Sequence, residues 1–328
     1  MDRPMNETER SLPAYVEPVA RGVYAIDTGF QRPRFDAAYL IVENGRAAFI
    51  DTGTHFAVPR LLGALAALGL ARDACDYVIP THVHLDHAGG VGALMAELPA
   101  AIALVHPRGA RHMVDPRQLW LGAQAVYGEE TMAREYGRAT PIAAARVRPT
   151  ADGMTVELGG RPLVFADTPG HARHHHCIWD AATRGWFTGD TFGIAYPEFR
   201  TARGPWLMPA TTPVQFEPEA LRASVERLLS FEPQAMYLTH YGRLDDPARY
   251  ARQLLALQDE LVALGLRERG AADRHQALRR GLHALFTASL REHGCTLAEA
   301  ELIALLELDI ELDAQGIASW LDRPAAAT

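Results

Sequence analysis

Lysine is absent from this 328-residue sequence, and all 32 of its basic residues are arginine. Mechanisms in which a lysine amine forms a Schiff base or attacks the substrate are therefore excluded. Cysteine is scarce, because only Cys75, Cys177 and Cys295 occur, far apart in the chain and odd in number. Cysteines this far apart argue against a disulfide framework and favour a reducing compartment. None of them forms a closely spaced pair of the kind that binds metal.

Targeting and membrane-spanning patterns are also lacking. The first ten residues contain no basic region followed by an apolar run, so no secretory signal is predicted. The best apolar stretch, residues 56–71, is interrupted by Pro59 and Arg60 and is too short to span a bilayer. The net charge of -8 and the pI near 6.0 argue against electrostatic binding of nucleic acid. We therefore expect a cytoplasmic protein that acts on a small molecule, without a nucleic-acid or membrane partner.

The stretch T-H-V-H-L-D-H-A-G-G at residues 81–90 concentrates metal-binding side chains. It contains His82, His84, Asp86 and His87 within six residues. Imidazole and carboxylate are ligands that zinc, iron and manganese accept, and a catalytic site needs about three protein ligands for each metal. Four ligands this close together suggest two neighbouring metals. The plainer alternative is a solvated polar loop.

The first half of the chain predicts alternating strands and helices. Residues 15–28 and 37–52 are rich in branched and aromatic side chains, and Asn44-Gly45 predicts a hairpin turn. Apolar periodicity then predicts, in order, a helix at 58–70, a strand at 77–80 that leads into the histidine stretch, a helix at 91–97 and a strand at 101–105. Residues 107–140, with Trp120, Tyr127 and Tyr136, read as helical and form either a packed excursion or a wall of the substrate pocket.

The second half predicts further strands followed by a helical tail. A hairpin at 153–167, a strand pair near 177–179 and 186–188, a proline-rich loop at 192–213, a helix at 216–230 and a last strand at 235–238 are expected. After Asp245 the pattern is helical, with leucine stripes over 254–264 and 278–286. Thr296 and Glu299 suggest a capping box for a third helix that ends near Leu306, followed by a short fourth helix with Trp320. We divide the chain into a catalytic domain, 1–245, and a helical extension, 246–328, whose role is packing or homodimerisation.

Together with T-P-G-H at 168–171, T-G-D-T at 188–191 and L-T-H at 238–240, the stretch at 81–90 resembles the metallo-β-lactamase fold superfamily. The resemblance covers residues 15–245, and the motifs occur in the family's order. It implies an α/β (α+β) fold, a four-layer αββα sandwich with the metals at one edge between the sheets, here carrying a C-terminal helical extension.

The resemblance also implies the ligand set. One metal would be held by His82, His84 and His171, and the second by Asp86, His87 and His240. Asp190 would bridge the two, and Asp51 would support the histidine loop. We expect two divalent ions, zinc in the first place, with iron or manganese as alternatives. Asp86 and Asp190 are the expected catalytic carboxylates, because they can orient or transfer the proton.

Further side chains are candidates for substrate contact. In the run that follows T-P-G-H, either His174 or His175 is expected to reach the pocket or to support a ligand, and Tyr241 could donate a hydrogen bond to an oxyanion. Tyr196, Phe199 and Trp206 in the proline-rich loop could form an apolar lid. For each of these, simple packing is the competing interpretation.

The expected reaction is hydrolysis of a small ester, lactone or thioester by a metal-bridging hydroxide. An anionic carrier would have to be met by arginines such as Arg279 and Arg280. The alternatives are a di-iron redox or dioxygenase enzyme, and a metal-binding sensor without turnover. Flavodiiron oxygen reductases of this fold typically carry Glu where this chain has His84, and they append a flavin domain, which disfavours the redox alternative.

Overall fold

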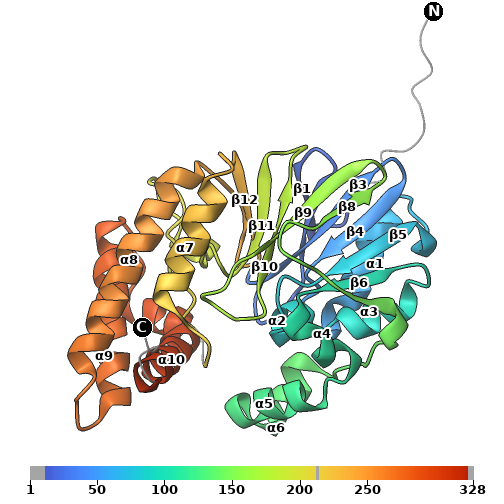
Figure 1. The fold of residues 1–328 in the computed structure, drawn as a ribbon. Coiled ribbons are helices and arrows are strands. Elements are labelled where there is room, and N and C mark those ends of the chain that lie inside the picture. Colours follow the sequence, from blue (N-terminus) through green and yellow to red (C-terminus); the bar gives the residue numbers. More distant parts are fainter. Residues whose placement is uncertain (1–11, 212–213, 324–328) are drawn as a thin grey trace, which may run out of the picture.

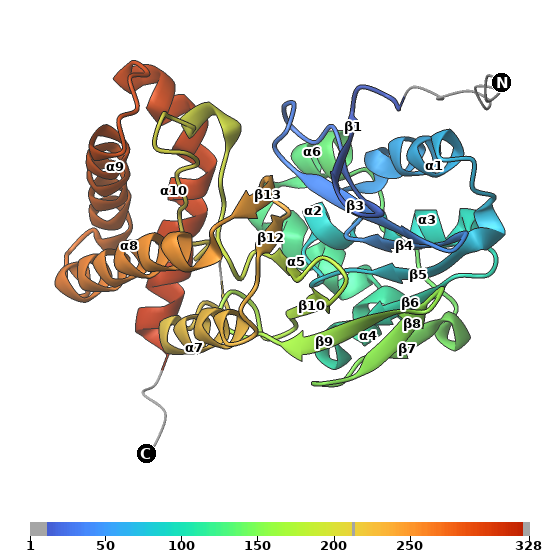
Figure 2. The ribbon, with the colours of Figure 1, turned by 90° about the horizontal axis from the view of Figure 1, so that it is seen from above.

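Two β-sheets pack face to face, and helices cover the outer face of each sheet (Figures 1 and 2). The computed structural model of the protein describes residues 12–211 and 214–323. Predictions for the first ten residues, for the last two residues of the 192–213 loop and for residues 324–328 lie outside this range. The layers follow the order helix, sheet, sheet, helix, so the predicted αββα sandwich with additional C-terminal helices is confirmed.

The first sheet has seven strands that are hydrogen-bonded in chain order. Its first four strands are antiparallel, and the last three are added in parallel. Asn44 and Gly45 have positive φ angles of 46° and 77°, which is the two-residue turn that an Asn-Gly pair predicts. The strands are β1 (Val16–Ala20), β2 (Val23–Asp27), β3 (Ala37–Glu43), β4 (Arg46–Ile50), β5 (Cys75–Ile79), β6 (Ile102–Val105) and β7 (Val147–Pro149).

The second sheet has six strands in the order β13-β12-β11-β10-β9-β8. All neighbours are antiparallel except β11 and β12. The prediction that β12 is the last strand is wrong, because β13 follows it, and β7 was also not expected. Both are short edge strands with exposed or charged residues, so neither has a distinctive apolar pattern. The strands are β8 (Thr155–Leu158), β9 (Arg161–Asp167), β10 (His176–Asp180), β11 (Gly185–Gly189), β12 (Ala235–Leu238) and β13 (Gly242–Asp245).

Three apolar clusters hold these layers together. Between the sheets, the rings of Tyr39 and Tyr237 lie 5.8 Å apart and both side chains are buried. Outside the first sheet, Leu61 and Leu65 belong to the predicted helical stripe and are fully buried. The helices that contribute to these outer clusters are α1 (Val58–Ala67), α3 (Val91–Glu97) and α4 (Pro107–Val114) on the first sheet, and α7 (Pro218–Leu229) and α8 (Pro247–Glu268) on the second.

The segment between α4 and β7 is largely helical and forms an excursion at the lower edge of Figure 1. It consists of α5 (Arg117–Tyr127), α6 (Glu129–Thr131) and a π-helical turn, Met132–Tyr136. No residue of α5 is fully buried, although one side of the helix is apolar. The remaining short elements are α2 (Leu85–Ala88) and the 3-10 turns His55–Ala57, Arg72–Ala74, Ala144–Arg146 and Pro197–Phe199.

The C-terminal helices are α8, α9 (Arg274–Glu292) and α10 (Glu299–Asp322). The predicted leucine stripes of α8 and α9 are buried, but the prediction of two helices after Thr296 is wrong, because α10 is a single helix of 24 residues. Apolar residues recur along its whole length and pack on α8 and α9, and Gly316 does not interrupt it. The predicted capping box is also wrong, because the helix starts after Ala298 without a side-chain cap. Within the described residues, every helix is too short or too polar to cross a bilayer.

Arg161 forms a buried ionic connection between the two sheets. Its Nε donates to Asp180 Oδ1 at 2.8 Å within the second sheet, and its Nη1 donates to the Arg21 carbonyl of the first sheet at 3.1 Å. Asp180 also accepts from Thr183 Oγ1. Both partners of the ion pair are essentially inaccessible to solvent. Removing Asp180 would therefore leave the buried guanidinium of Arg161 with only a more distant carboxylate, that of Glu43, whose Oε2 lies 3.5 Å from Nη1.

Asp180→Ala is expected to lower the free energy of unfolding by about 3 kcal/mol, because the guanidinium of Arg161 would remain buried without its nearest and fully buried carboxylate. Urea denaturation followed by circular dichroism measures the change. Asp245→Ala is the matched control, since it removes a 70% exposed carboxylate paired with Arg243 and should cost below about 1 kcal/mol. Equal losses for the two variants would contradict the prediction.

Candidate metal centre

Metal-binding side chains converge because they follow the ends of several strands. Asp51 follows β4, His82 follows β5, Asp190 follows β11, and His240 follows β12, while His171 lies in the turn between β9 and β10. These residues are almost completely buried. Residues separated by up to 189 positions in the chain, as Asp51 and His240 are, therefore meet at one end of the sandwich.

Gly189 allows Asp190 to approach the other strand ends closely. Its φ is 47°, and a Cβ atom at this position would lie 2.5 Å from both Thr81 Oγ1 and His175 Nε2. A larger residue would thus be strained and would also clash. The Asp190 amide, directly beyond the glycine, donates to His175 Nε2 at 3.3 Å.

Seven candidate ligands form two adjacent groups. In each group the ligand atoms lie within 4.8 Å of one another, as a shared metal ion requires. The first group contains His82, His84, His171 and Asp190, and the second contains Asp86, His87 and His240. The structure thus brings together all seven residues that the sequence suggested as ligands.

The Asp190 carboxylate lies between the two groups and turns one oxygen toward each. Its Oδ2 is 3.4 Å from His171 Nε2 and 4.0 Å from His82 Nε2. Its Oδ1 is 3.3 Å from His87 Nε2 and 3.8 Å from His240 Nε2. A carboxylate in this position can serve two neighbouring cations at once.

The far ring nitrogens of three imidazoles point at oxygen atoms that can accept a hydrogen bond. His87 Nδ1 is 2.8 Å from Asp51 Oδ2, His171 Nδ1 is 3.0 Å from the Ala210 carbonyl, and His240 Nδ1 is 2.9 Å from the Phe35 carbonyl. These contacts place the N–H at Nδ1 and leave the Nε2 lone pair directed into the cluster. This is the outer arrangement that orients metal-binding histidines in proteins.

The buried polar atoms and charges of the cluster fit divalent cations. His87 Nε2 and Asp190 Oδ1 are buried, and neither has a hydrogen-bond partner within the described part of the chain. Such a buried atom costs about 1–3 kcal/mol unless something satisfies it. Burial, together with the neighbouring imidazoles, lowers the pKa of His82 and His84 well below 6.5, so both are in the neutral form that binds metal.

In the second group the carboxylates dominate the electrostatics. Burial acts to lower the pKa of His87, but the carboxylates of Asp190 and Asp86 outweigh it and raise this pKa well above its ordinary value. His240 responds in the same way, and its pKa is raised to about 9 against the effect of burial. This half of the cluster therefore attracts positive charge, which a divalent ion would supply.

A family model described as the metallo-beta-lactamase superfamily matches residues 31–240, which contain every residue of the cluster. The chain belongs to the metallo-β-lactamase superfamily. The resemblance drawn from the sequence motifs is thereby confirmed.

Several members of this superfamily are similar to the chain. A metallo-beta-lactamase fold-containing protein of Sulfurisphaera tokodaii is 24% identical over 68% of this chain and 79% of its own length. A hydroxyacylglutathione hydrolase of Acidiphilium cryptum is 27% identical over 66% of this chain and 68% of its own length. An acyl-coenzyme A thioesterase of Gallus gallus is 28% identical over 53% of this chain and 64% of its own length.

Solved structures share the fold at lower identity. A metallo-beta-lactamase family protein of Thermus thermophilus has a TM-score of 0.65 at 20% identity and covers 92% of this chain and 93% of its own. A chemotaxis sensor, ODP, solved with a peroxy diiron species, has a TM-score of 0.52 at 17% identity and covers 74% of this chain and 94% of its own. At these identities the likeness shows the fold alone.

In this member of the superfamily, a cavity of about 410 Å³ opens over the cluster. Three of its lining residues, His84, Asp86 and Asp190, belong to the candidate ligands. Its wall also contains residues of α5, together with Tyr136 and Leu312 of α10. A substrate in this cavity would therefore contact the candidate ligands directly.

The cavity contains only part of the predicted substrate contacts. His174 lines it, whereas His175 is fully buried beneath Asp190 and bonds to Thr168 Oγ1 at 2.9 Å, which makes it a support for the Asp190 turn. Tyr241 packs with Arg34, whose guanidinium lies 4.8 Å above its ring, and does not line the cavity.

The predicted apolar lid is wrong. Tyr196, Phe199 and Trp206 are buried, and none of them lines the cavity. Trp206 packs on Phe286 and donates from Nε1 to Ser289 Oγ at 2.9 Å, so α9 covers it. The aromatic residues of this loop are thus core residues beneath the C-terminal helices.

The interpretation of residues 107–140 as a wall of the substrate pocket agrees with part of the cavity lining. Tyr127 and Tyr136 line the cavity, whereas Trp120 does not. Burial raises the pKa of both tyrosines well above the ordinary value, so their hydroxyl groups stay protonated. The contributions of Leu119 and Leu312 were missed, although the apolar spacing along each helix was a visible signal.

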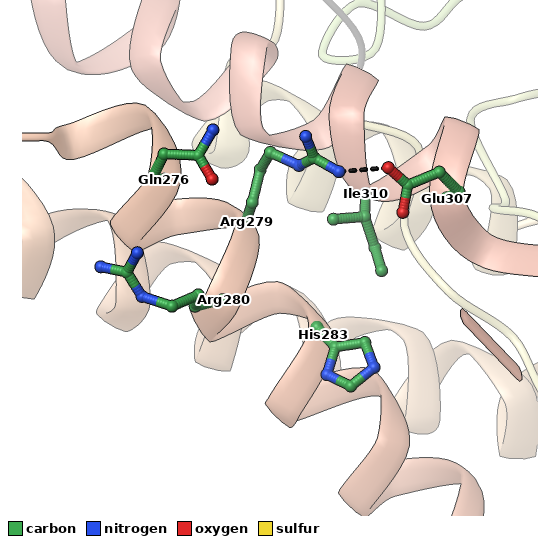
Figure 3. A pocket seen from close by; sticks show the side chains of 6 residues that line it. All are labelled: Gln276, Arg279, Arg280, His283, Glu307 and Ile310. Carbon is green, nitrogen blue, oxygen red and sulfur yellow. Dashed lines mark hydrogen bonds and ion pairs between the residues drawn. The ribbon is translucent and has the colours of Figure 1, made fainter. Parts of the chain in front are cut away.

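A second hollow of about 410 Å³ lies between α9 and α10 and shares no lining residue with the first (Figure 3). It contains Arg279 and Arg280, the arginines expected to meet an anionic carrier. Arg279 is paired with Glu307 and, at 3.3 Å, with Glu311, so its charge is already compensated. An anionic group bound to the cluster would therefore not meet this arginine within the same cavity.

Helix α10 reaches the first ligand group through Asp313. The Asp313 carboxyl group accepts hydrogen bonds from the Thr211 amide at 2.8 Å and from Thr211 Oγ1 at 2.7 Å. The preceding residue, Ala210, provides the carbonyl that faces His171 Nδ1. The position of this carbonyl, and hence the orientation of His171, depends on the contact with α10.

Helix α10 reaches the second group through Asp309. Its Oδ1 accepts from the Tyr196 hydroxyl at 3.0 Å, and the Tyr196 ring stacks on Phe35 at a centroid distance of 4.9 Å. The Phe35 carbonyl faces His240 Nδ1. The C-terminal helices therefore support the cluster in addition to packing against the sandwich.

Asp313→Asn is expected to raise the melting temperature, and the gain should grow between about pH 5 and pH 8. Burial raises the pKa of Asp313 from 3.8 to about 8. In that window the folded protein retains a proton that the unfolded chain has released, so wild-type stability falls by up to about 1.4 kcal/mol per pH unit from this group. Asparagine keeps the acceptor oxygen for Thr211 but does not titrate, so it adds no pH dependence to the stability of the variant.

Differential scanning calorimetry of both proteins across this pH range measures the effect. Asp259→Asn, which changes a 67% exposed carboxylate on α8, is the control and should give a difference that does not grow with pH. A pH-independent difference for Asp313→Asn would contradict the assigned protonation.

Proposed function

We propose that the protein is a metal-dependent hydrolase that cleaves a small, uncharged ester, lactone or thioester. The observation that carries this proposal is the Asp190 carboxylate, with one oxygen facing each of two ligand groups, at the floor of a cavity large enough for a small molecule. The relatives that hydrolyse acyl compounds, a hydroxyacylglutathione hydrolase and an acyl-coenzyme A thioesterase, support it.

His82, His84, His171 and Asp190 would hold one ion, and Asp86, His87 and His240 the other, with Asp190 shared. A pair of divalent ions, when bound, lowers the pKa of a water molecule and polarises the bond to be cleaved. Zinc is the first expectation, because imidazole and carboxylate ligands suit it, and manganese and iron accept the same set.

The chain's own residues supply proton transfer and orientation. The Asp86 side chain is 26% exposed and lines the cavity, so its carboxylate can accept a proton from the attacking water and return it to the leaving group. Asp190 is more deeply buried and instead fixes the spacing of the two groups. His174 lies beside the cluster, and its pKa is lowered to about 3 by burial, so it contacts the substrate as a neutral group.

A di-iron redox enzyme is the second candidate. The structural likeness to the chemotaxis sensor with a peroxy diiron species supports it, as does a ligand set that iron accepts. Two observations favour hydrolysis over this redox alternative. Residue 84 is histidine where flavodiiron oxygen reductases of this fold typically carry glutamate, and the relatives of the chain include hydrolases of acyl compounds.

Metal removal tests the proposal. Elemental analysis of the purified protein should give about two equivalents of zinc or manganese, and dialysis against a chelator should abolish hydrolysis of a panel of uncharged esters, lactones and thioesters until metal is restored. Turnover in a metal-free preparation would refute the mechanism. Iron together with oxygen consumption would support the redox enzyme, and retained metal without turnover would indicate a sensor.

A further inference from the structure

One face of α5 is apolar and is only partly covered by the protein. Along this helix Leu119, Ala123 and Val126 line the cavity over the cluster, and Val126 is 46% exposed. Val214, which also lines the cavity, is 63% exposed. Apolar surface of this kind, rimming a cavity, marks a site for an apolar ligand.

Gly122 lies in the middle of this face, one helical turn from Gln118 and from Val126, both of which also line the cavity. A Cβ atom at Gly122 would meet nothing within 4 Å, so no packing contact requires glycine there. Glycine inside a helix costs about 0.5–1 kcal/mol relative to alanine. The absence of a side chain at Gly122 therefore leaves space open in the cavity, and it makes α5 less stable than alanine would.

The lining chemistry limits what can occupy this space. Among the described residues, charged side chains in the cavity wall are confined to the candidate ligands, and the remaining polar groups are tyrosines, glutamines and histidines. An anionic or cationic tail would find no partner on α5. An aliphatic tail would gain about 0.8 kcal/mol for each buried methylene, which corresponds to about fourfold in affinity.

We propose that the cavity binds the aliphatic chain of an acyl substrate, with the carbonyl at the metal cluster and the chain lying across Gly122. The inference rests on the proposed hydrolysis and names its substrate class, medium-chain acyl esters, lactones or thioesters. The occupant is the substrate because the same cavity ends on His84, Asp86 and Asp190, so anything bound along α5 reaches the reacting groups. A second copy of the chain on this face would block them.

Binding of carboxylates, which resemble the hydrolysis product, tests the inference without turnover. Isothermal titration of the metal-loaded protein with butanoate, hexanoate, octanoate and decanoate should show affinity rising about fourfold per methylene until the cavity is filled. Gly122→Leu should weaken decanoate binding by about tenfold or more while leaving butanoate unchanged, because leucine would occupy the space for the distal chain.

Two variants control for folding and for added apolar surface. Gly122→Ala should raise the melting temperature and change decanoate affinity less than Gly122→Leu does. Gly270→Leu places the same side chain where nothing lies within 4 Å, outside the cavity, and should change neither affinity.

The possible outcomes separate this inference from the proposed function. Affinity that does not depend on chain length, or equal weakening of butanoate and decanoate by Gly122→Leu, overturns the inference. A concentration-dependent dimer that Gly122→Leu disrupts also overturns it, because α5 would then be a self-association face. Chain-length-dependent binding in a protein that hydrolyses no acyl compound supports the acyl site and refutes the hydrolase.

Discussion

Asp190→Asn is expected to lower the proposed metal-dependent hydrolysis by about 10³-fold or more. The carboxylate places one oxygen toward each ligand group, and an amide would offer one acceptor and one N–H donor instead. Metal ions contribute several kcal/mol to transition-state stabilisation, so disturbing both at once costs at least three powers of ten in rate. Steady-state kinetics on an accepted ester, together with metal analysis of the variant, measures the loss.

Asp322→Asn is the matched control for this substitution. Its carboxylate is 62% exposed on α10 and is paired with Arg274, away from the cluster. It should retain wild-type kcat/KM and metal content. An Asp190→Asn protein that keeps both its metals and most of its rate would remove this carboxylate from the mechanism.

Asp51→Asn is expected to weaken metal binding by about 10–100-fold without unfolding the protein. The Asp51 carboxylate accepts from Thr81 N at 2.7 Å, from Thr239 Oγ1 at 2.8 Å and from His87 Nδ1 at 2.8 Å. Asparagine can present an N–H to His87 Nδ1, which moves the ring proton to Nε2, the atom that faces the cluster. Competition with a chromophoric chelator measures the affinity.

Thr239→Val provides the comparison for Asp51→Asn. It removes one hydroxyl partner of Asp51 but keeps the bond to His87. Its effect on metal affinity should be smaller than that of Asp51→Asn, while circular dichroism shows both proteins folded. If the two variants bound zinc equally well, the control of the His87 tautomer by Asp51 would be wrong.

The sandwich was predictable because its central strands have strong apolar patterns, whereas the full set of candidate ligands came from the resemblance of four motifs to the superfamily, and the structure brings these side chains together. The chain after Thr296 was mispredicted because weak local signals around Thr296 suggested a cap, while packing on α8 and α9 extends α10 through Gly316. Tyr196 and Trp206 look like lid residues in a proline-rich loop. Their burial depends on helical residues 113 and 83 positions later in the chain, which local patterns do not reveal.

The cavity wall was predictable only in part for the same reason. Tyr127 and Tyr136 were recognised as possible wall residues from their aromatic character. The face of α5 that lines the cavity, and the contribution of Leu312 from α10, depend on tertiary placement. The role proposed for Gly122 can be inferred only once the space beside it is known.

The two links from α10 to the cluster have a consequence for biosynthesis. His240 completes the set of candidate ligands, and Glu299, the first residue of α10, is added 59 residues later. At about 5–20 residues per second, a ribosome needs roughly 3–12 s to cover that distance. The nascent chain therefore holds every candidate ligand for several seconds before the helix that braces His171 and His240 exists, and a metal captured in that interval would meet a looser and less selective site.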